Sequence, residues 1–350
     1  MIAITLHDLR FRARQFLIAV VGAGLVFSMA LLLTGLANSF RAEVRRTVAS
    51  VGADAWIVSN GSSGPFTAFG ALPATTVDAL ASTPGVRAAD PLVIVPETTT
   101  IDGEVHGLRL FGHRPGGMGA PEPSEGRAVR IDGEVVVDRR LGLDVGDGLD
   151  LVGRHLVVVG LVRGHTLLGG IPNVYATVSD AQRIAFQGQP LVTTVVVSGA
   201  PAAPPAGMTV LSSEAVRADT VHAMRDAIAS IDNSRSLMWI VAAVIVAALM
   251  YVSALERLRD FAVLKSLGAP SWLLFVGVAL QSIAVTLLAA VFALGASRVM
   301  RPMFALPTSV PVSAYVVLPI VAVVVGLVSS LVALRRAVSV DPASAFAGAM

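Results

Sequence analysis

The chain has no cysteine and few charged residues, which make up 14% of its 350 residues. Without cysteine it has no disulfide framework, no thiolate metal site and no cysteine nucleophile. Soluble domains carry about 25% charged residues, so a soluble protein is disfavoured. Hydrophobic residues account for 54% of the chain, and the mean hydropathy is +0.74. These values indicate a membrane protein.

The sequence also lacks the motifs of common enzymes. It has no G-x-x-x-x-G-K-[ST] phosphate-binding loop and no H-E-x-x-H metal motif. Five of its six histidines lie between residues 37 and 236, at spacings that match no common metal site. We therefore expect exposed or locally hydrogen-bonded histidines, no catalytic residues, no metal and no cofactor bound by the chain itself. A membrane-anchored ectoenzyme is disfavoured for the same reason.

Four uncharged stretches stand out, at residues 16–36, 237–255, 272–295 and 316–334. Each approaches the roughly 20 residues that a helix needs to cross about 30 Å of hydrocarbon. The apolar region of a cleaved signal peptide is only about 7–15 residues long, so residues 16–36 are expected to remain as an anchor. The predicted fold is an integral membrane α-helical protein with four transmembrane helices and a large domain, residues 37–236, between the first two.

Basic residues near the ends of these stretches predict the orientation. The N-terminal segment 1–15, the loop 256–271 and the tail 335–350 all carry arginines, and four crossings place them on one side. Basic residues mark cytoplasmic loops, so both termini are predicted to be cytoplasmic, and residues 37–236 and the loop 296–315 extracytoplasmic. The net charge is −4 for residues 37–236 and +6 for the remainder. The pI near 9.5 therefore reflects arginines beside the membrane and gives no support to nucleic-acid binding.

Residues 37–236 show the pattern of an α+β domain held between two helical stalks. The first helix is expected to continue to about residue 50 and to end at Gly52. Helices are expected at 77–81, at 179–186 with Ser179 as N-cap, and at 210–235. Short β-branched runs separated by Asp-Gly turns predict strands, at residues 55–58, 92–95, 108–111, 134–137, 149–152, 156–162 and 193–197.

Two features lie within the crossings. Gln281 is one of few polar residues there, and a polar group inside a membrane is a functional candidate, although an interhelical hydrogen bond explains it more simply. The Gly22-Ala23-Gly24 segment predicts close helix packing, because small residues let helix backbones approach each other.

The loop 256–271 has a helical pattern that Gly268 and Pro270 would end. One side is apolar and the other is charged, but Val263, Leu264 and Leu267 break that division. Such a mixed surface favours a short helix that docks on a protein partner, and an ordinary lipid-surface helix is the alternative.

The run from residue 255 to 269 resembles the R-x-R-E-[FI]-A-[VI]-L-[KR]-[AS]-[LI]-G-A signature of MacB/FtsX-type ABC transporter permeases, with Asp260 in place of the usual Glu. The segments at 52–54, 143–147 and 335–342 are similar to that family too. The arrangement of one helix, a large outer domain and three further helices is also the family's. The form Gly52-Ala53-Asp54-Ala55-Trp56 looks closest to the DevC-like branch with a single four-helix core.

The resemblance implies a permease subunit in the bacterial inner membrane. Two copies would pair as a homodimer in the lipid bilayer, and two copies of a separate ABC ATPase would bind ATP and Mg²⁺. The implied mechanism is export by mechanotransmission, in which ATPase closure moves the stalks and the outer domain, and the substrate would be an amphiphile such as a lipid, peptide or haem. The loop would contact the ATPase, and the residues assigned to this coupling are Glu256, Arg257, Arg259, Asp260, Phe261, Leu264, Lys265, Leu267 and Gly268.

An alternative from another class is an FtsX-like regulatory membrane protein, which relays ATPase motion to an extracytoplasmic partner. That branch usually has a smaller outer domain, which disfavours it here. Whether an extracytoplasmic partner is needed is left open by the sequence.

Overall fold

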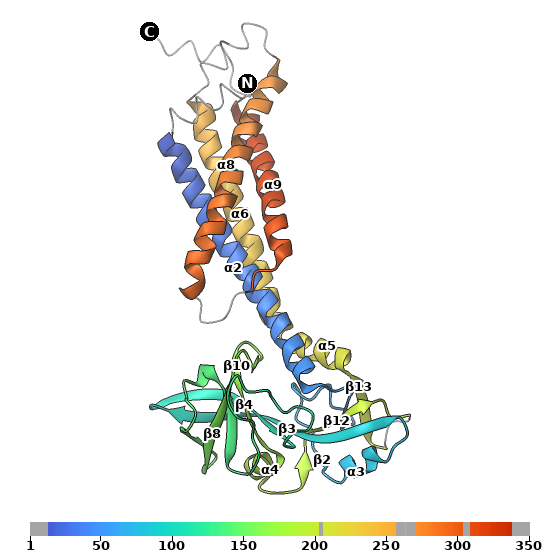
Figure 1. Ribbon diagram of the computed structural model, residues 1–350. Coiled ribbons are helices and arrows are strands. Elements are labelled where there is room, and N and C mark those ends of the chain that lie inside the picture. The colour runs from blue at the N-terminus through green and yellow to red at the C-terminus, as the bar shows by residue number, and fades with distance from the viewer. Residues whose placement is uncertain (1–12, 203–205, 257–262, 264–269, 304–308, 338–350) are drawn as a thin grey trace. The chain divides into compact units, whose positions relative to one another are not determined.

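The computed structural model describes residues 13–202, 206–256, 263, 270–303 and 309–337 (Figure 1). The chain divides into two compact units. The helical unit comprises Met1–Ser39 and Ala227–Met350, and the sheet domain comprises Phe40–Asp226. Each unit has its own hydrophobic core.

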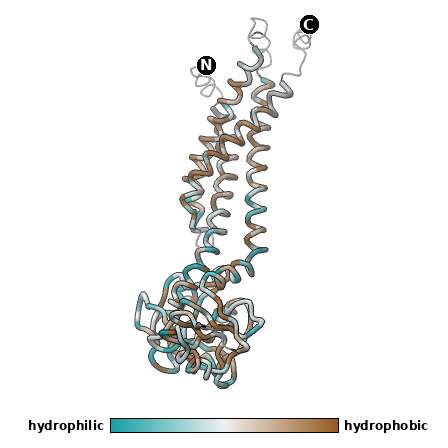
Figure 2. Tube along the Cα trace, turned by 90° about the vertical axis from the view of Figure 1, so that its right-hand side faces the viewer, coloured by the Kyte–Doolittle hydropathy of each residue, from teal (hydrophilic) through white to brown (hydrophobic). Residues whose placement is uncertain are grey.

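Within the described residues, four helices are long and apolar enough to cross a membrane. They are α2 (Ala13–Val51), α6 (Arg225–Leu255), α8 (Ser271–Met300) and α9 (Val312–Ala337). These helices contain the four predicted stretches, and Figure 2 shows apolar residues dominating them. Helices α8 and α9 extend into the predicted loop 296–315, where the short turn η2 (Arg301–Met303) follows α8.

Small residues bring the four helices together. The core of the helical unit is built largely from alanines, with Phe27 and Leu31 from α2 and Met250 from α6 among its larger members. At Gly24 a Cβ atom would lie 2.6 Å from a ring carbon of Phe292 and 3.0 Å from the carbonyl oxygen of Ala289. Helices α2 and α8 therefore approach too closely there for any side chain, which agrees with the packing role predicted for this segment.

The sheet domain combines one large sheet with short helices. Within the described residues, eleven strands form this sheet and two form a small separate one. The elements in chain order are β1 (Ala55–Ser59), β2 (Leu72–Pro73), α3 (Thr76–Ala81), β3 (Val86–Ile101), β4 (Glu104–His113), β5 (Glu125–Gly126), β6 (Glu134–Asp138), η1 (Arg139–Leu141), β7 (Gly148–Leu151), β8 (Arg154–Val162), β9 (Thr166–Leu167), β10 (Ile171–Thr177), α4 (Val178–Phe186), β11 (Leu191–Val192), β12 (Thr194–Gly199), β13 (Met208–Ser212) and α5 (Ser213–Ala223).

Strand β3 is shared by the two halves of the large sheet. The strand order is β13-β1-β12-β3-β4-β10-β6-β8-β5, with β7 beside β8 and β9 beside β10. The first part of β3 pairs with β12 and the rest, from Val93, pairs with β4. At this exchange of partners the Thr193 hydroxyl donates to the Leu92 carbonyl at 3.1 Å and accepts from the Ile94 N–H at 2.8 Å. One side chain thus satisfies backbone groups where the pairing changes.

Alternation along the strands sets the core of this domain. Leu108 and Leu110 of β4 point into the apolar core, together with Val135 and Val137 of β6. Helix α4 covers part of this face. At Gly112 a Cβ atom would clash with the Ala181 Cβ and lie 3.2 Å from the Val93 Cβ, so α4 rests almost directly on the backbone of β4.

Three expectations about local structure need correction. The N-cap of α4 is Thr177, whose hydroxyl accepts from the Asp180 N–H, and Ser179 already lies inside the helix. The segment expected as a helix at 210–235 begins as strand β13, and Ser212 then caps α5. Strand β10 was not expected, because Pro172 and Asn173 disfavour a strand by propensity, although pairing with β4, β6 and β9 overrides that preference.

Replacing Gly112 by alanine is expected to destabilise the sheet domain by about 1–3 kcal/mol, because the new methyl group overpacks the contact with α4. The measurement is thermal unfolding of the full-length protein in detergent, followed by fluorescence of the buried Trp56. Gly107→Ala on the same strand is the matched control, since a Cβ there meets nothing within 4 Å. Equal unfolding temperatures for the two variants would contradict the assigned contact.

Glu134 carries the most strongly shifted carboxylate outside the helices. Two hydrogen bonds from Arg127 and backbone donation from Arg130 at 3.0 Å lower the pKa of Glu134 from 4.5 to about 2. A lowered pKa stabilises the fold above the unfolded value of 4.5, and this contribution disappears as the pH falls toward about 2.

Glu134→Gln is therefore expected to lower the free energy of unfolding by about 1–2 kcal/mol at pH 7. The difference from wild type should shrink as the pH falls from 4.5 toward 2. Denaturant unfolding across this pH range measures it. Glu122→Gln, at an exposed position, is the control, and a pH-independent difference for Glu134→Gln would show that charge is not the cause.

Candidate functional site

The loop predicted to contact an ATPase follows α6. Glu256 lies directly after α6, and its N–H donates to the Val252 carbonyl at 3.1 Å. Val263 is helical, with an exposed side chain. The other residues predicted for this contact lie outside the described residues: Arg257, Arg259, Asp260, Phe261, Leu264, Lys265, Leu267 and Gly268.

Gln281 is buried in α8, with 4% of its surface exposed, next to the fully buried Ser282. In the described part of the chain, neither the Gln281 amide nitrogen nor the Ser282 hydroxyl has a hydrogen-bond partner. One turn further along α8, the Thr286 hydroxyl donates to the Ser282 carbonyl at 3.1 Å. The interhelical hydrogen bond expected for Gln281 thus stays a prediction for the assembled protein, and the buried amide remains available for it.

A second candidate site is the point where α2 is fixed to the sheet domain. Glu43 of α2 is 4% exposed, and its carboxylate accepts the N–H groups of Gly169 at 3.0 Å and Gly170 at 2.9 Å. Both glycines have φ near +92°, which side chains with a Cβ rarely adopt. They lie between β9 and β10, so one carboxylate holds the tip of this hairpin through two hydrogen bonds. We call this arrangement the α2 anchor.

Further contacts extend the attachment along α2. One turn after Glu43, the Thr47 hydroxyl donates to the Thr166 carbonyl at 3.0 Å. At the end of the helix, the Val51 carbonyl accepts the Gly119 N–H at 3.0 Å. The last two and a half turns of α2, about nine residues, are therefore held by side chains and by backbone and belong to the sheet domain.

The other connection to the helical unit is built differently. Helix α5 is tied to β1, because the Ser213 hydroxyl accepts from the Trp56 indole N–H and donates to the Ala53 carbonyl. Between α5 and α6 the helix is interrupted at Met224, whose ψ is 4°. Helix α2 crosses the boundary between the two units without interruption, whereas the return connection has a break beside it.

A row of polar side chains lies on and beside strands β4, β6 and β10 of the sheet domain. His113 is fully buried and His165 contacts the Tyr175 hydroxyl at 2.8 Å. Burial lowers the pKa of both histidines and raises the pKa of Tyr175, so all three stay neutral at physiological pH. Asp138 already accepts two backbone N–H groups, from Arg140 and His165. The row therefore reads as structural, and the histidines are locally bonded as expected.

The sequence analysis predicts neither the α2 anchor nor the break at Met224. Glu43 and its glycine partners are 126 and 127 residues apart along the chain, and a lone Glu on a stalk looks like a solvated charge. The paired glycines in Leu168-Gly169-Gly170 were the available signal. Among the described residues, no group of three His, Asp or Glu side chains is placed to hold a metal ion.

Comparison with known proteins places these features in a family. The FtsX-like permease C-terminal family matches residues 236–342. Uncharacterized ABC transporter permeases of Mycobacterium bovis and Mycobacterium tuberculosis are 41% identical over 350 residues, covering 99% of this chain and 100% of theirs.

Two solved structures are similar to the sheet domain at a lower level. The periplasmic region of MacB from Actinobacillus actinomycetemcomitans has a TM-score of 0.35 and 11% identity, covering 50% of this chain and 96% of that one. The extracellular domain of the transporter YknZ from Gram-positive bacteria has a TM-score of 0.31 and 15% identity, covering 38% of this chain and 75% of that one.

Identity of this extent over the full length of the mycobacterial proteins shows the family. This family assignment also agrees with the four apolar helices and with the family match over α6, α8 and α9. The chain belongs to the FtsX-like ABC transporter permeases, as a membrane protein with a sheet-rich domain between its first two apolar helices.

Proposed function

We propose that this permease is the membrane subunit of an exporter that works by mechanotransmission, with α2 as the rigid element that moves the extracytoplasmic domain. The observation that carries the proposal is the α2 anchor on an unbroken helix. At 1.5 Å per residue, the 39 residues of α2 extend about 58 Å, whereas the hydrocarbon layer is about 30 Å thick. The same helix thus has length for the membrane and for about two and a half further turns fixed to the sheet domain.

The chain carries no phosphate-binding loop, so the energy source in this proposal is a separate ABC ATPase in two copies, which also binds ATP and Mg²⁺. Two permease copies form a homodimer in the bacterial inner membrane. Both termini and the loop 256–271 face the cytoplasm, because arginines gather there. The loop is then the contact through which ATPase closure reaches α6 and α8.

The two connections to the sheet domain have different roles in this scheme. Uninterrupted backbone hydrogen bonding makes α2 stiff along its axis, so a shift of its membrane part reaches Glu43 undiminished. The break at Met224 gives the α5–α6 connection a point of bending, because interruptions of helical hydrogen bonding are where helices bend. A rigid connection beside a bending one converts a displacement of the helices into a tilt of the domain.

Arg257→Glu in the loop is expected to weaken ATPase binding at least tenfold, because a reversed charge replaces an attraction by a repulsion at the proposed contact. Pull-down of the ATPase by the purified permease measures it, and Phe261→Ala tests the apolar part of the same contact. Arg298→Glu, at the opposite end of α8, is the control. Wild-type stoichiometry and coupled ATP hydrolysis with both loop variants would rule out this assignment.

Glu43→Gln is expected to reduce transmission from α2 to the sheet domain, because an amide cannot accept both glycine N–H groups as the carboxylate does. The cysteine-free chain allows a single spin label at Val105→Cys, an exposed position on β4. The proposed homodimer then carries one label on each permease copy. In the reconstituted permease–ATPase complex, the distance between these two labels should change on trapping with ATP and vanadate. This change in distance should be at least twofold smaller in Glu43→Gln.

The control for the anchor experiment is Glu122→Gln, which removes an exposed carboxylate from the same domain. A distance change of wild-type size in Glu43→Gln would exclude the anchor as the transmitting contact. ATP hydrolysis measured in parallel separates lost transmission from lost ATPase binding.

A further inference from the structure

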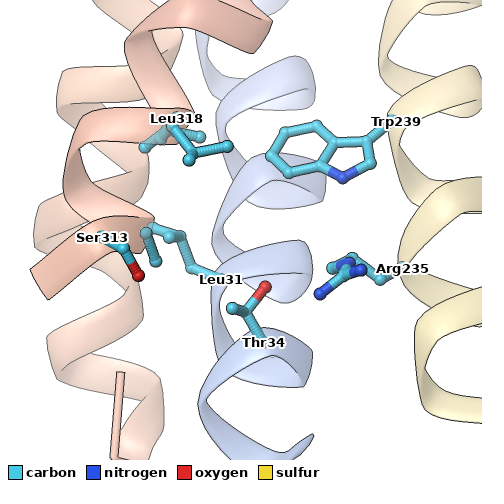
Figure 3. A pocket seen from close by; sticks show the side chains of 8 residues that line it. Leu31, Thr34, Arg235, Trp239, Ser313 and Leu318 are labelled. Atoms are coloured by element: carbon cyan, nitrogen blue, oxygen red, sulfur yellow. The ribbon is translucent and has the colours of Figure 1, made fainter. Parts of the chain in front are cut away.

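The helical unit contains a cavity of about 310 Å³ between α2, α6 and α9. Figure 3 shows Arg235 and Trp239 of α6 extending toward Leu31 and Thr34 of α2, with Leu318 of α9 on the other side. Ser313, Ala314 and Val317 of α9 complete the lining. All of the lining residues belong to the helical unit, so the cavity is a feature of a single core.

One part of the cavity wall is polar and positively charged. Arg235 lies one turn before Trp239 on the same face of α6, and its ion pair within the described residues is a local one with Asp232 at 3.1 Å. The guanidinium has five N–H donors, so this pair leaves donors for a ligand. Thr34 donates its hydroxyl to the Ala30 carbonyl at 2.8 Å, so its oxygen can accept a hydrogen bond but has no second proton to donate. The remaining donors of this wall are the Arg235 guanidinium and the Ser313 hydroxyl, and they suit an anionic group bearing oxygens.

The other part of the wall is apolar. Leu31 and Leu318 are 2% and 1% exposed, and the Trp239 ring is fixed by Phe27, whose ring centroid lies 5.4 Å away. A charged wall next to an apolar wall in one cavity matches a ligand that has both characters.

The position of the cavity along the helices is that of a membrane interface. Arg235 and Trp239 flank the start of the apolar stretch 237–255, Thr34 lies near the end of stretch 16–36, and Ser313 precedes stretch 316–334. Arginine and tryptophan are both typical of the level where hydrocarbon meets head groups. Arg298 and Arg301 lie at the same end of the helical unit, where Asp232 is the acidic residue among the described ones, so the local charge is positive.

We propose that this cavity binds the anionic head group and first acyl carbons of an amphiphile. Small-molecule sites range from roughly 300 to 1,000 Å³, so a cavity of 310 Å³ holds a head group and a short apolar segment, and the rest of the chain remains in the bilayer. Arg235 pairs with the anion, the Ser313 hydroxyl donates to one of its oxygens, and Trp239 with Leu318 covers the first carbons. A bilayer phospholipid and a single-chain amphiphile entering from water share this chemistry.

The experiment uses Trp239 as the reporter. The full-length protein carries Trp272→Phe, and the remaining Trp56 is fully buried in the sheet domain. The protein is reconstituted in phosphatidylcholine vesicles that contain, as a minor component, either brominated phosphatidylglycerol or brominated phosphatidylcholine. Bromine quenches a contacting indole. The anionic lipid is expected to be enriched roughly fivefold over the zwitterionic one at Trp239, since a basic residue near the surface contributes about that factor.

Arg235→Gln should abolish this preference, whereas Arg298→Gln, a charge change at the same end but outside the cavity lining, should retain it. Relief of quenching by added dodecyl phosphate would identify a single-chain amphiphile as an occupant, and its absence would identify the bilayer lipid. The proposal is overturned by equal quenching from the two brominated lipids, by a preference that survives Arg235→Gln, or by full relief with inorganic phosphate alone.

This binding site depends on the four helices spanning the membrane and not on ATP coupling. The assay contains no ATPase, so a negative result leaves the coupling contacts of the loop and of Glu43 standing. Conversely, failure of those contacts would leave the lipid preference at Trp239 unchanged.

Discussion

A single unbroken ladder of backbone hydrogen bonds in α2 is the constraint on which the rest of the structure depends. Inside hydrocarbon, no water is present to satisfy an interrupted peptide group, so the helix has to run through the apolar layer intact. Beyond that layer a break would cost little, yet α2 continues to Val51. The continuation is stabilised because its buried face, including Glu43 and Thr47, contacts the sheet domain and not water.

The energetics of Glu43 explain why this contact is a strong one. A buried carboxylate is costly unless its oxygens are hydrogen-bonded, and here both oxygens receive N–H groups from adjacent glycines. Hydrogen bonds to a charged group contribute about 1.5–3 kcal/mol each. The left-handed backbone at Gly169 and Gly170 aims both N–H groups at one point. Sliding α2 along the hairpin would leave the charge buried without partners, so the pair moves together or not at all.

How far the sequence predicts this molecule depends on the range of the interactions involved. The four crossings follow from uncharged stretches whose length matches the bilayer, which is a local property. Strands such as β8 are visible because β-branched residues gather within a few positions. Strand β10 is invisible in the same terms, because neighbours far along the chain impose its conformation on Pro172 and Asn173. The sequence places Ser212 in the helix predicted at 210–235, whereas it ends strand β13 and caps helix α5. A residue with these two roles has no distinct local sequence pattern.

The candidate sites also differ in whether they depend on local or on long-range interactions. The loop 256–271 could be singled out from a local pattern and a signature, and its role stays a proposal. The α2 anchor and the cavity beside Arg235 come from contacts between segments that the sequence leaves far apart. Both use a charged side chain that lies in a segment predicted only as helix: Glu43 in the continuation of the first helix and Arg235 at the end of the segment 210–235.

Those two charges also suggest why α2 contributes to both sites. The face of α2 that carries Leu31 and Thr34 lines the cavity, and Glu43 follows about two and a half turns later on the same unbroken helix. A displacement of α2 relative to α6 and α9 has to change the cavity wall, because Leu31 and Thr34 move with the helix. In the proposed mechanism the same displacement would reach the β9–β10 hairpin through Glu43. Helix α2 therefore contributes side chains both to the cavity wall and to the attachment of the sheet domain.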